Sequence, residues 1–512
     1  MKLKQLVLAA LLAALGTAEA AKPNIIYILV DDMGPGDVSC YNPEGLIQTP
    51  NIDRMAAEGM KFMDAHTSAS VCTPTRYGIL TGRYSWRTHL KEGVVGLHDP
   101  SLISMDRETV ASFMKKEGYA TACIGKWHLG QGWANNAPEG IKRITPKYVD
   151  ATKPIKDGPL DLGFDYYFGA FPRDQFYVEG RQMLGDLELV MDKKELTALG
   201  YFEPDPGWIS KGFKQREKLK TLVHKTGGWI RNHAENPFFI YLALPSPHGP
   251  VIPHPDFQGK SGICAYADYC METDWVVGEV LKTLDELKLA ENTMVFFTAD
   301  NGSSPGGPDV KNLKKAGHDP SWIYRGAKGS IYEGGHRLPF VVRWPRQIKA
   351  GSVSEQTICT TDLLATCAEL VGKKLPDNVA EDSISFLPAL KGDPIPDEEN
   401  RLIVHHDRHG YFAARKGKWK LVLDSTSGGR YDLKKQRDIQ DASEMMLFDM
   451  DVDREETRNL ASQYPEVTEQ LKKELADLIS KGRSTPGTPQ ANDPLRDGQT
   501  WHQFNALQDD LK

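Results

Sequence analysis

An apolar run near the N-terminus reads Asn24-Ile25-Ile26-Tyr27-Ile28-Leu29-Val30, and Asp31-Asp32-Met33-Gly34 follows it directly. Such a run, without polar alternation, is typical of a central strand in a sheet that helices cover on both faces. The same form recurs in three further runs: 119–124 before Lys126 and His128, 238–244 before His248, and 294–299 before Asp300 and Asn301.

Stretches with helical character lie between these runs, at 51–59, 109–117 and 266–287. Strands that alternate with helices predict an α/β fold whose central sheet is largely parallel. In sheets of this kind, ligands bind beyond the carboxyl ends of the strands. All four polar clusters follow the carboxyl end of a predicted strand, so we expect the functional site at that edge.

The character of the chain changes near residue 390. Residues 392–400 are rich in proline and acidic residues and predict a linker. Strand-like pieces and then a helix follow, at 402–406, 411–415, 419–423, 446–449 and 464–481. We therefore expect a catalytic domain over 21–390, a small α+β domain with an antiparallel sheet over 391–485, and an irregular extension over 486–512.

Composition limits the classes of protein that this chain can belong to. It has 512 residues, of which 40% are hydrophobic and 26% charged, the values of a soluble globular protein. The formal net charge of −7 argues against a nucleic-acid partner. The seven cysteines show no spacing typical of a disulfide scaffold, so no pairing is predicted.

The first 20 residues predict a cleaved signal peptide. Lys2 and Lys4 precede an apolar run over 6–15, and Ala18-Glu19-Ala20 offers a small-residue cleavage site. The apolar run is too short to span a membrane, so we expect no membrane anchor. The predicted destination is the periplasm or the outside of the cell.

A second informative run reads Val71-Cys72-Thr73-Pro74-Thr75-Arg76-Tyr77-Gly78-Ile79-Leu80-Thr81-Gly82-Arg83. Proline is favoured in the first turn of a helix, so Cys72 is predicted at a helix N-terminus, where backbone N–H groups and the helix dipole favour an anion. Arg76 lies about one turn further and can direct a planar cation at the same anion. Taken alone, the cysteine is better explained as a buried residue of a loop–helix junction.

Two polar pairs suggest a metal site. Asp31 with Asp32, and Asp300 with Asn301, offer oxygen ligands only, which suit a hard cation such as calcium better than zinc. A single acidic pair is more often a turn or a helix cap. Two pairs that each end a buried strand favour metal binding.

Four basic residues complete the candidate chemistry. Lys126 and His128 are two residues apart, so in extended chain both can face one side. His248 lies in a proline-rich loop, and Lys328 lies in a glycine-rich stretch. Individually, an exposed lysine and a packed histidine explain these residues as well.

Together these motifs resemble the type I sulfatases of the arylsulfatase A-like family. The pattern Cys-x-Pro-x-Arg, followed by x-x-x-x-Thr-Gly, is complete over residues 72–82. The block Gly-Lys-Trp-His-Leu-Gly is complete over 125–130, and Lys-Gly-x-x-x-Glu-Gly-Gly is complete over 328–335. The resemblance is strong over residues 22–345 and implies an alkaline-phosphatase-like α/β sandwich.

The resemblance also implies a mechanism. A maturation enzyme would oxidise Cys72 to formylglycine (3-oxoalanine), and one hydroxyl of the hydrated aldehyde would attack sulfur. Ca²⁺ would be held by Asp31, Asp32, residue 72, Asp300 and Asn301. Asp300 would help to remove the proton of the nucleophile. Arg76, Lys126 and Lys328 would supply the positive charge that the anionic ester needs. His248 would be the acid that protonates the leaving alcohol. His128 would be the base that deprotonates the second hydroxyl, which then expels sulfate.

Clues to the substrate are fewer. Arg173 and Asp174 follow a Gly-Phe-Asp block, and the resemblance implies that the segment after such a block reaches the mouth of the site. A solvated loop explains these two residues about equally well. His336 and Arg337 lie near Lys328 in sequence and are candidates for the pocket wall. We expect a sulfated sugar, with galactose or N-acetylgalactosamine sulfate at a glycan end as the candidates.

Two alternatives stay open. One is a phosphatase or phosphodiesterase of the same superfamily, which would normally use serine or threonine with two zinc ions and more histidine ligands. The other is a non-catalytic binder of sulfated glycans, in which Cys72 is never matured.

Overall fold

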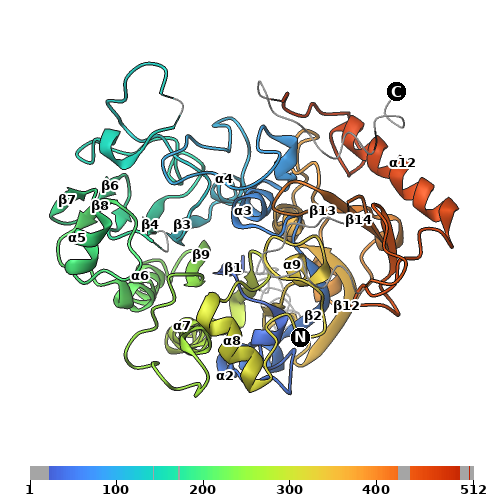
Figure 1. The fold of residues 1–512 in the computed structure, drawn as a ribbon, viewed down its shortest axis with the longest axis horizontal. Coiled ribbons are helices and arrows are strands. Elements are labelled where there is room, and N and C mark those ends of the chain that lie inside the picture. Colours follow the sequence, from blue (N-terminus) through green and yellow to red (C-terminus); the bar gives the residue numbers. More distant parts are fainter. Residues whose placement is uncertain (1–21, 142, 171–172, 425–438, 496–506, 508–512) are drawn as a thin grey trace, which may run out of the picture.

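The computed structural model describes residues 22–141, 143–170, 173–424, 439–495 and 507. The predicted signal peptide lies outside the described residues, and so does most of the chain beyond residue 495. Ten strands form the central sheet (Figure 1), in the order β12 (Ser352–Cys359), β2 (Met60–His66), β11 (Phe340–Arg343), β10 (Thr293–Ala299), β1 (Asn24–Asp31), β9 (Phe238–Pro247), β3 (Ala120–Gly125), β4 (Tyr166–Gly169), β5 (Val178–Glu179) and β6 (Gln182–Met183).

The centre of this sheet is parallel, as predicted. β1 pairs with β10 on one side and with β9 on the other. β9 in turn pairs with β3, and β3 with β4, and all of these pairs are parallel. β11 is antiparallel to both of its neighbours, and β5 and β6 form an antiparallel edge. The sheet is therefore mixed but largely parallel. β1, β9 and β10 are one to three residues longer than predicted, and β3 has the predicted length but begins one residue later.

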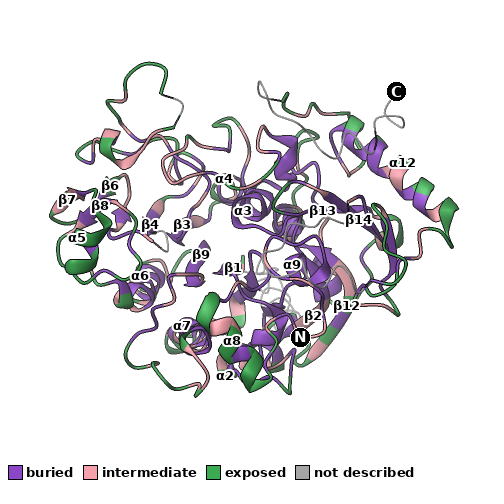
Figure 2. Cartoon of the chain, viewed as in Figure 1, coloured by how far each residue is buried: buried purple, intermediate pink, exposed green. Residues whose placement is uncertain are grey.

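Every residue of β1 is buried because helices cover both faces of the sheet (Figure 2). Ile25, Tyr27 and Leu29 face one hydrophobic cluster, and the alternating residues Ile26 and Ile28 face the other. The first face is covered by α3 (Cys72–Thr81), α4 (Val110–Lys116), α10 (Leu363–Leu370) and α11 (Leu387–Leu390). The second face is covered by α2 (Pro50–Ala57), α6 (Lys218–Asn232), α7 (Ala265–Glu286) and α8 (Gly307–Ala316).

A four-stranded antiparallel sheet forms the predicted C-terminal unit, with β13 (Ile403–His406), β14 (Phe412–Lys416), β15 (Trp419–Val422) and β16 (Met446–Asp449) in sequence order. One face packs on α12 (Pro465–Lys481) and on Trp86. The other face packs on Ile331 and Tyr332, close in sequence to Lys328. The small sheet therefore supports the loop that carries a candidate catalytic lysine.

A hairpin of β7 (Leu187–Val190) and β8 (Gly207–Ser210), with α5 (Lys193–Ala198) between its strands, stands at the far side of the molecule from α12 (Figure 1). Its own small core contains Leu196 and Ile209. The short helix α9 (Glu333–His336) precedes β11. No helix among the described residues combines the length and the apolar character that crossing a membrane requires.

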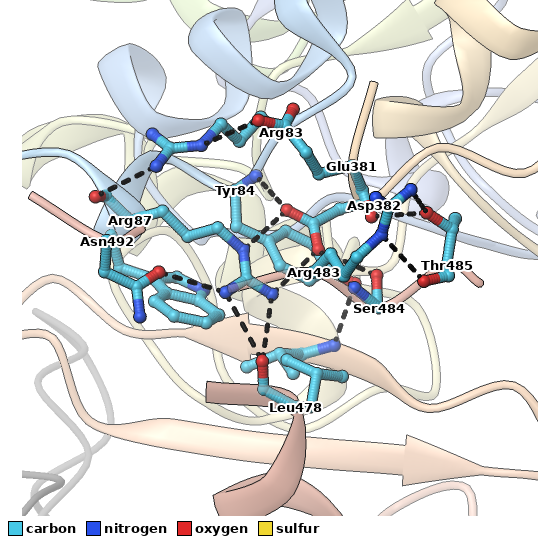
Figure 3. A network of polar contacts seen from close by, with 12 residues as sticks. Arg83, Tyr84, Arg87, Glu381, Asp382, Leu478, Arg483, Ser484, Thr485 and Asn492 are labelled. Atoms are coloured by element: carbon cyan, nitrogen blue, oxygen red, sulfur yellow. Dashed lines mark hydrogen bonds and ion pairs between the residues drawn. The ribbon is translucent and has the colours of Figure 1, made fainter. Parts of the chain in front are cut away.

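Residues 482–495, the described part of the chain directly after α12, contain no helix or strand and are held by side chains that follow α3. Figure 3 shows the guanidinium of Arg87 facing the Asp382 carboxylate, at 2.8 and 2.9 Å, and the side chain of Asn492, at 3.1 Å. Arg83 donates to the carbonyl of Ala491 at 2.9 Å, and Ser484 Oγ donates to Asp382 at 2.8 Å. The buried arginines that follow α3 thus tie residues 484–492 to the core.

Removal of the Asp382 carboxylate is expected to be strongly destabilising. Asp382→Ala leaves Arg87 buried without its bidentate partner, and breaking a buried ion pair in this way costs about 3–5 kcal/mol. We expect a fall of this size in the free energy of unfolding, measured by urea denaturation. The control is Asp186→Ala, which removes an exposed partner of Lys211 and is expected to change stability by less than about 1 kcal/mol. Similar effects of the two variants would contradict the assignment of Asp382 as an anchor.

Candidate active site

Candidate residues lie at or directly after the carboxyl ends of four strands of the central sheet. Asp31 is the last residue of β1, and Asp300 follows β10 directly. Lys126 follows β3, and His248 follows β9. Because β1, β3, β9 and β10 run parallel, their carboxyl ends meet at this edge, and the side chains predicted to form the site lie close together there.

Two lysines pair with the aspartates that end β1. Lys126 Nζ lies 2.7 Å from Asp31 Oδ2, and Lys328 Nζ lies 2.6 and 2.8 Å from the two oxygens of Asp32. Both aspartates are buried. Burial would raise the pKa of the Asp31 carboxyl, but the neighbouring Lys126 lowers it to about 2. Both carboxylates are therefore ionised at neutral pH.

Arg76 pairs with the third carboxylate. Its Nε and Nη2 donate to Asp300 Oδ2 at 3.0 and 2.7 Å, and its Nη1 donates to the carbonyl of Lys126 at 3.1 Å. The sequence suggested that Arg76 points at a bound anion. In the structure, its guanidinium instead holds Asp300 and the Lys126 backbone in place.

Cys72 is the first residue of α3, as the proline-based pattern predicted. Its Sγ lies 3.4 Å from Asp31 Oδ1 and 3.4 Å from Lys328 Nζ. Burial, followed by the nearby Asp300 carboxylate, raises the pKa of the Cys72 thiol well above its usual range. The unmodified side chain therefore stays a protonated thiol, which is a weak nucleophile.

The residues at this edge fit a hard cation. Ligand atoms of Asp31, Asp32, Cys72 and His248 lie within 4.8 Å of one another. Asn301 donates its amide to Asp32 Oδ1 at 2.8 Å, whereas its buried Oδ1 has no hydrogen-bond partner among the described residues. A buried carbonyl oxygen left unsatisfied costs about 1–3 kcal/mol, and a cation would satisfy it. The carboxylates together with this amide oxygen form the donor set that a hard divalent cation prefers.

Two histidines flank this group. His128 has a positive φ of 55°, and its Nε2 lies 3.1 Å from the carbonyl of Val95. His248 Nδ1 lies 2.6 Å from the carbonyl of Gly249, and its Nε2 lies 3.7 Å from Asp32 Oδ2. Burial lowers the pKa of both imidazoles below the usual histidine value, so both are neutral at pH 7.

Two glycines permit close backbone approach at the site. A Cβ at Gly125 would lie 1.9 Å from the carbonyl oxygen of Ala243, where β3 ends beside β9. A Cβ at Gly302 would lie 1.8 Å from the carbonyl oxygen of Gly334, which joins the loop after β10 to the Lys328 block. Gly125 and Gly302 therefore allow neighbouring loops to lie close enough to bring their side chains together.

A cavity of about 250 Å³ opens beside these residues. Its lining includes Lys126, His128 and His248, and also Arg173 and Asp174, so the structure brings the predicted substrate-binding pair to the site. Arg173 is held by the carbonyl of Glu203, to which its Nη1 donates at 3.2 Å.

His336 and Arg337, also predicted to line the pocket, are fully or almost fully buried and do not line this cavity. Arg337 pairs with Glu333 and Asp64, each at 2.8 Å, and His336 Nδ1 lies 3.1 Å from His66 Nδ1. Their side chains connect the Lys328 block to β2 instead. Proximity to Lys328 in sequence therefore did not predict proximity to the cavity.

The cavity wall also contains aromatic residues that the sequence did not single out. Trp133 and Trp208 line it together with Gln175. Trp208 lies on β8, and no local pattern near it signals a binding site. Only the placement of the β7–β8 hairpin beside the central sheet brings it to the cavity.

The comparisons with known proteins agree with this geometry. The family model described as sulfatase matches residues 23–373, and the model described as N-sulphoglucosamine sulphohydrolase, C-terminal, matches residues 326–481. An N-acetylgalactosamine-6-O-sulfatase of Bacteroides thetaiotaomicron is 33% identical, over 90% of this chain and 94% of its own. Human arylsulfatase A is 31% identical, over 90% and 88%.

A solved Bacteroides thetaiotaomicron structure, described with the metabolism of multiple glycosaminoglycans, superposes with a TM-score of 0.77. It is 32% identical and covers 90% of this chain and 99% of its own. The family model spans more than half of the chain, and relatives above 30% identity span nearly all of it. The chain therefore belongs to the sulfatase family and is a sulfuric ester hydrolase with an alkaline-phosphatase-like fold.

Proposed function

We propose that this sulfatase releases sulfate from a sulfated carbohydrate, with galactose or N-acetylgalactosamine sulfate at a glycan end as the candidate. The observation that carries the proposal is the cavity next to Cys72, which combines cationic groups with tryptophan side chains. Aromatic rings pack on the apolar faces of sugars, and Arg173 and Asp174 offer hydrogen bonds to hydroxyl groups. The name of the Bacteroides relative, N-acetylgalactosamine-6-O-sulfatase, supports the choice of sugar.

We further propose that Cys72 is converted to formylglycine by a maturation enzyme. The complete Cys-x-Pro-x-Arg motif supports this proposal, and so does a thiol that burial keeps protonated. The modified residue would supply a hydroxyl nucleophile and a route by which sulfate leaves without a second attack of water on sulfur.

The surrounding side chains would bind the ester and move protons. Lys126 and Lys328 bring positive charge to the sulfate group. His248 is the proposed acid for the leaving alcohol oxygen, and its Nε2 can deliver a proton only after the neutral ring has taken one up, which a bound anionic ester would favour. His128 accepts a proton in the step that frees sulfate. Asp300, held by Arg76, assists removal of the proton of the nucleophile.

The metal is proposed to be Ca²⁺, held by Asp31, Asp32, Asp300, Asn301 and residue 72. The carboxylates of Asp31, Asp32 and Asp300 and the unsatisfied oxygen of Asn301 support a hard cation over zinc. When bound, the ion would hold a sulfate oxygen and offset the negative charge that develops during transfer. Export through a cleaved signal peptide over residues 1–20 remains part of the proposal, based on the sequence alone.

Sulfate release from defined substrates tests the substrate assignment. The full chain, coexpressed with a formylglycine-generating enzyme, would be incubated with sulfated mono- and oligosaccharides of galactose and N-acetylgalactosamine, and free sulfate measured. We expect release from one regioisomer, together with an aldehyde mass at residue 72. Release only from phosphate esters would favour the phosphatase alternative. No aldehyde and no release, with retained glycan binding, would favour the non-catalytic binder.

Loss of the residue-72 side chain is expected to abolish turnover. Cys72→Ala removes the proposed source of the nucleophile, and we expect sulfate release to fall by at least about a thousandfold, the range seen when a nucleophile is removed. Circular dichroism should show an unchanged fold, since the alanine fills most of the same space. Arg346→Ala, at a surface site away from the cavity, is the control. Retained activity in Cys72→Ala would rule out the nucleophile assignment.

Calcium is expected to stabilise the folded protein, because a ligand that binds only the native state shifts unfolding. We expect the melting temperature to rise with Ca²⁺ concentration. A chelator should lower the melting temperature, and added Ca²⁺ should raise it again. Asn301→Ala removes the unsatisfied oxygen but no carboxylate, so it should weaken Ca²⁺ binding about tenfold or more in a titration. Asn136→Ala, an exposed asparagine outside the group, should leave binding unchanged. Equal affinities in the two variants would contradict the assignment of Asn301 as a ligand.

A further inference from the structure

A second cavity, of about 720 Å³, lies beside the catalytic one. Trp208 lines both cavities, and its Nε1 donates to the carbonyl of Pro146 at 3.1 Å. Pro146 belongs to the lining of the catalytic cavity, whereas Lys147 belongs to the second. The two cavities therefore share the side chain of Trp208 as part of their walls and lie next to each other.

Backbone hydrogen bonds hold the walls of the second cavity together. Gly132 and Lys156 exchange two of them, at 2.7 and 2.9 Å. Asp150 N donates to Ala134 O at 2.8 Å, and Asn136 N donates to Tyr148 O at 2.9 Å. The two chain segments that form the cavity are thus cross-linked along their length. The cavity is formed in the protein before any ligand arrives, so binding there would not require the walls to be ordered first.

The charge of the second cavity contrasts with that of the whole protein. The chain carries a net charge of −7, yet the described residues that line this cavity include three exposed lysines, Lys147, Lys153 and Lys156, and one acidic residue, Asp150. The Asp150 carboxylate accepts hydrogen bonds from the backbone N–H and the hydroxyl of Thr152, at 3.0 and 2.6 Å. Its Oδ1 is therefore hydrogen-bonded within its own turn. The cavity therefore presents a local excess of positive charge.

We propose that this second cavity binds the neighbouring sugars of an anionic glycan whose terminal sulfated sugar occupies the catalytic cavity. This inference rests on the proposed function and extends it from a sulfated sugar to a chain with further acidic groups. Lys153 and Lys156 bind sulfate or carboxylate groups of the chain as point charges. The ring of Trp208 packs against the face of a sugar between the two cavities, and the amide of the exposed Asn136 bonds to hydroxyl groups.

Binding measurements on the Cys72→Ala protein test this proposal without turnover. The probes are N-acetylgalactosamine 6-sulfate and three tetrasaccharides that end in this sugar, whose inner sugars are uronic acids, sulfated hexoses or neutral hexoses. Isothermal titration calorimetry in low salt is expected to show tighter binding of an acidic tetrasaccharide than of the monosaccharide. The inner group that binds better identifies whether carboxylate or sulfate is preferred.

The double variant Lys153→Ala/Lys156→Ala in the same background should weaken binding of the acidic tetrasaccharides about fivefold, the size expected for two exposed ion pairs, and should not change binding of the monosaccharide. The weakening should diminish as salt rises. Lys314→Ala, an exposed lysine on α8 away from the β7–β8 hairpin, is the control (Figure 1).

Equal binding of all four probes, or no binding of any, overturns the proposal. An equal loss for acidic and neutral tetrasaccharides also overturns it, because the lysines would then not be binding charge. The proposed function is tested separately in the matured wild-type protein. Sulfate release from the monosaccharide without a preference for longer acidic chains contradicts this inference alone, whereas the absence of sulfate release from every sulfated sugar contradicts the proposed function.

Discussion

Three carboxylates cannot be buried beside one another at a sheet edge without compensating charge, and this constraint organises the active site. Desolvation of an unpaired carboxylate would cost several kcal/mol or would force it to take up a proton. Lys126, Lys328 and Arg76 each pair with one of the three aspartates. The cations come from three separate segments of the chain, so the electrostatic requirement also fixes how β3, α3 and the loop before α9 meet.

The supports of the site follow from the same requirement. Arg76 can hold Asp300 only if α3 keeps its position, and buried arginines just beyond α3 bind the segment that follows α12. Lys328 can reach Asp32 only if its loop is supported, and the face of the small antiparallel sheet packs against Ile331 and Tyr332 of that loop. The C-terminal unit therefore supports the active site through packing, while all six paired charges at the site come from residues before 330.

Much of the fold and of the site could be predicted because the signals are local. Uninterrupted apolar runs identify β1, β3, β9 and β10, and the residues just after them are the ones that meet. The other features depend on distant contacts. Trp208 reaches the cavity through the β7–β8 hairpin, and the anchor of Arg83 lies 408 residues away at Ala491. His336 and Arg337 were misjudged because the chain after Glu333 turns into the interior, where Asp64 offers a buried partner.

The balance of charge at the active site limits how strongly its own side chains can attract an anionic substrate. The three cations and three carboxylates cancel, so the side chains of the centre hold together without a surplus of either sign. Lys126 and Lys328 can still donate hydrogen bonds to the ester, while a net attraction for its negative charge comes from a bound divalent cation, whose charge is not cancelled, or from positive groups outside the centre. Lysines in an open cavity can supply the second kind of attraction, at the lower strength that exposure to water allows. An acidic chain can therefore combine two kinds of site. The buried active site, whose paired charges cancel, carries out the chemistry, and the exposed second cavity, with its excess of lysines, selects anionic substrates.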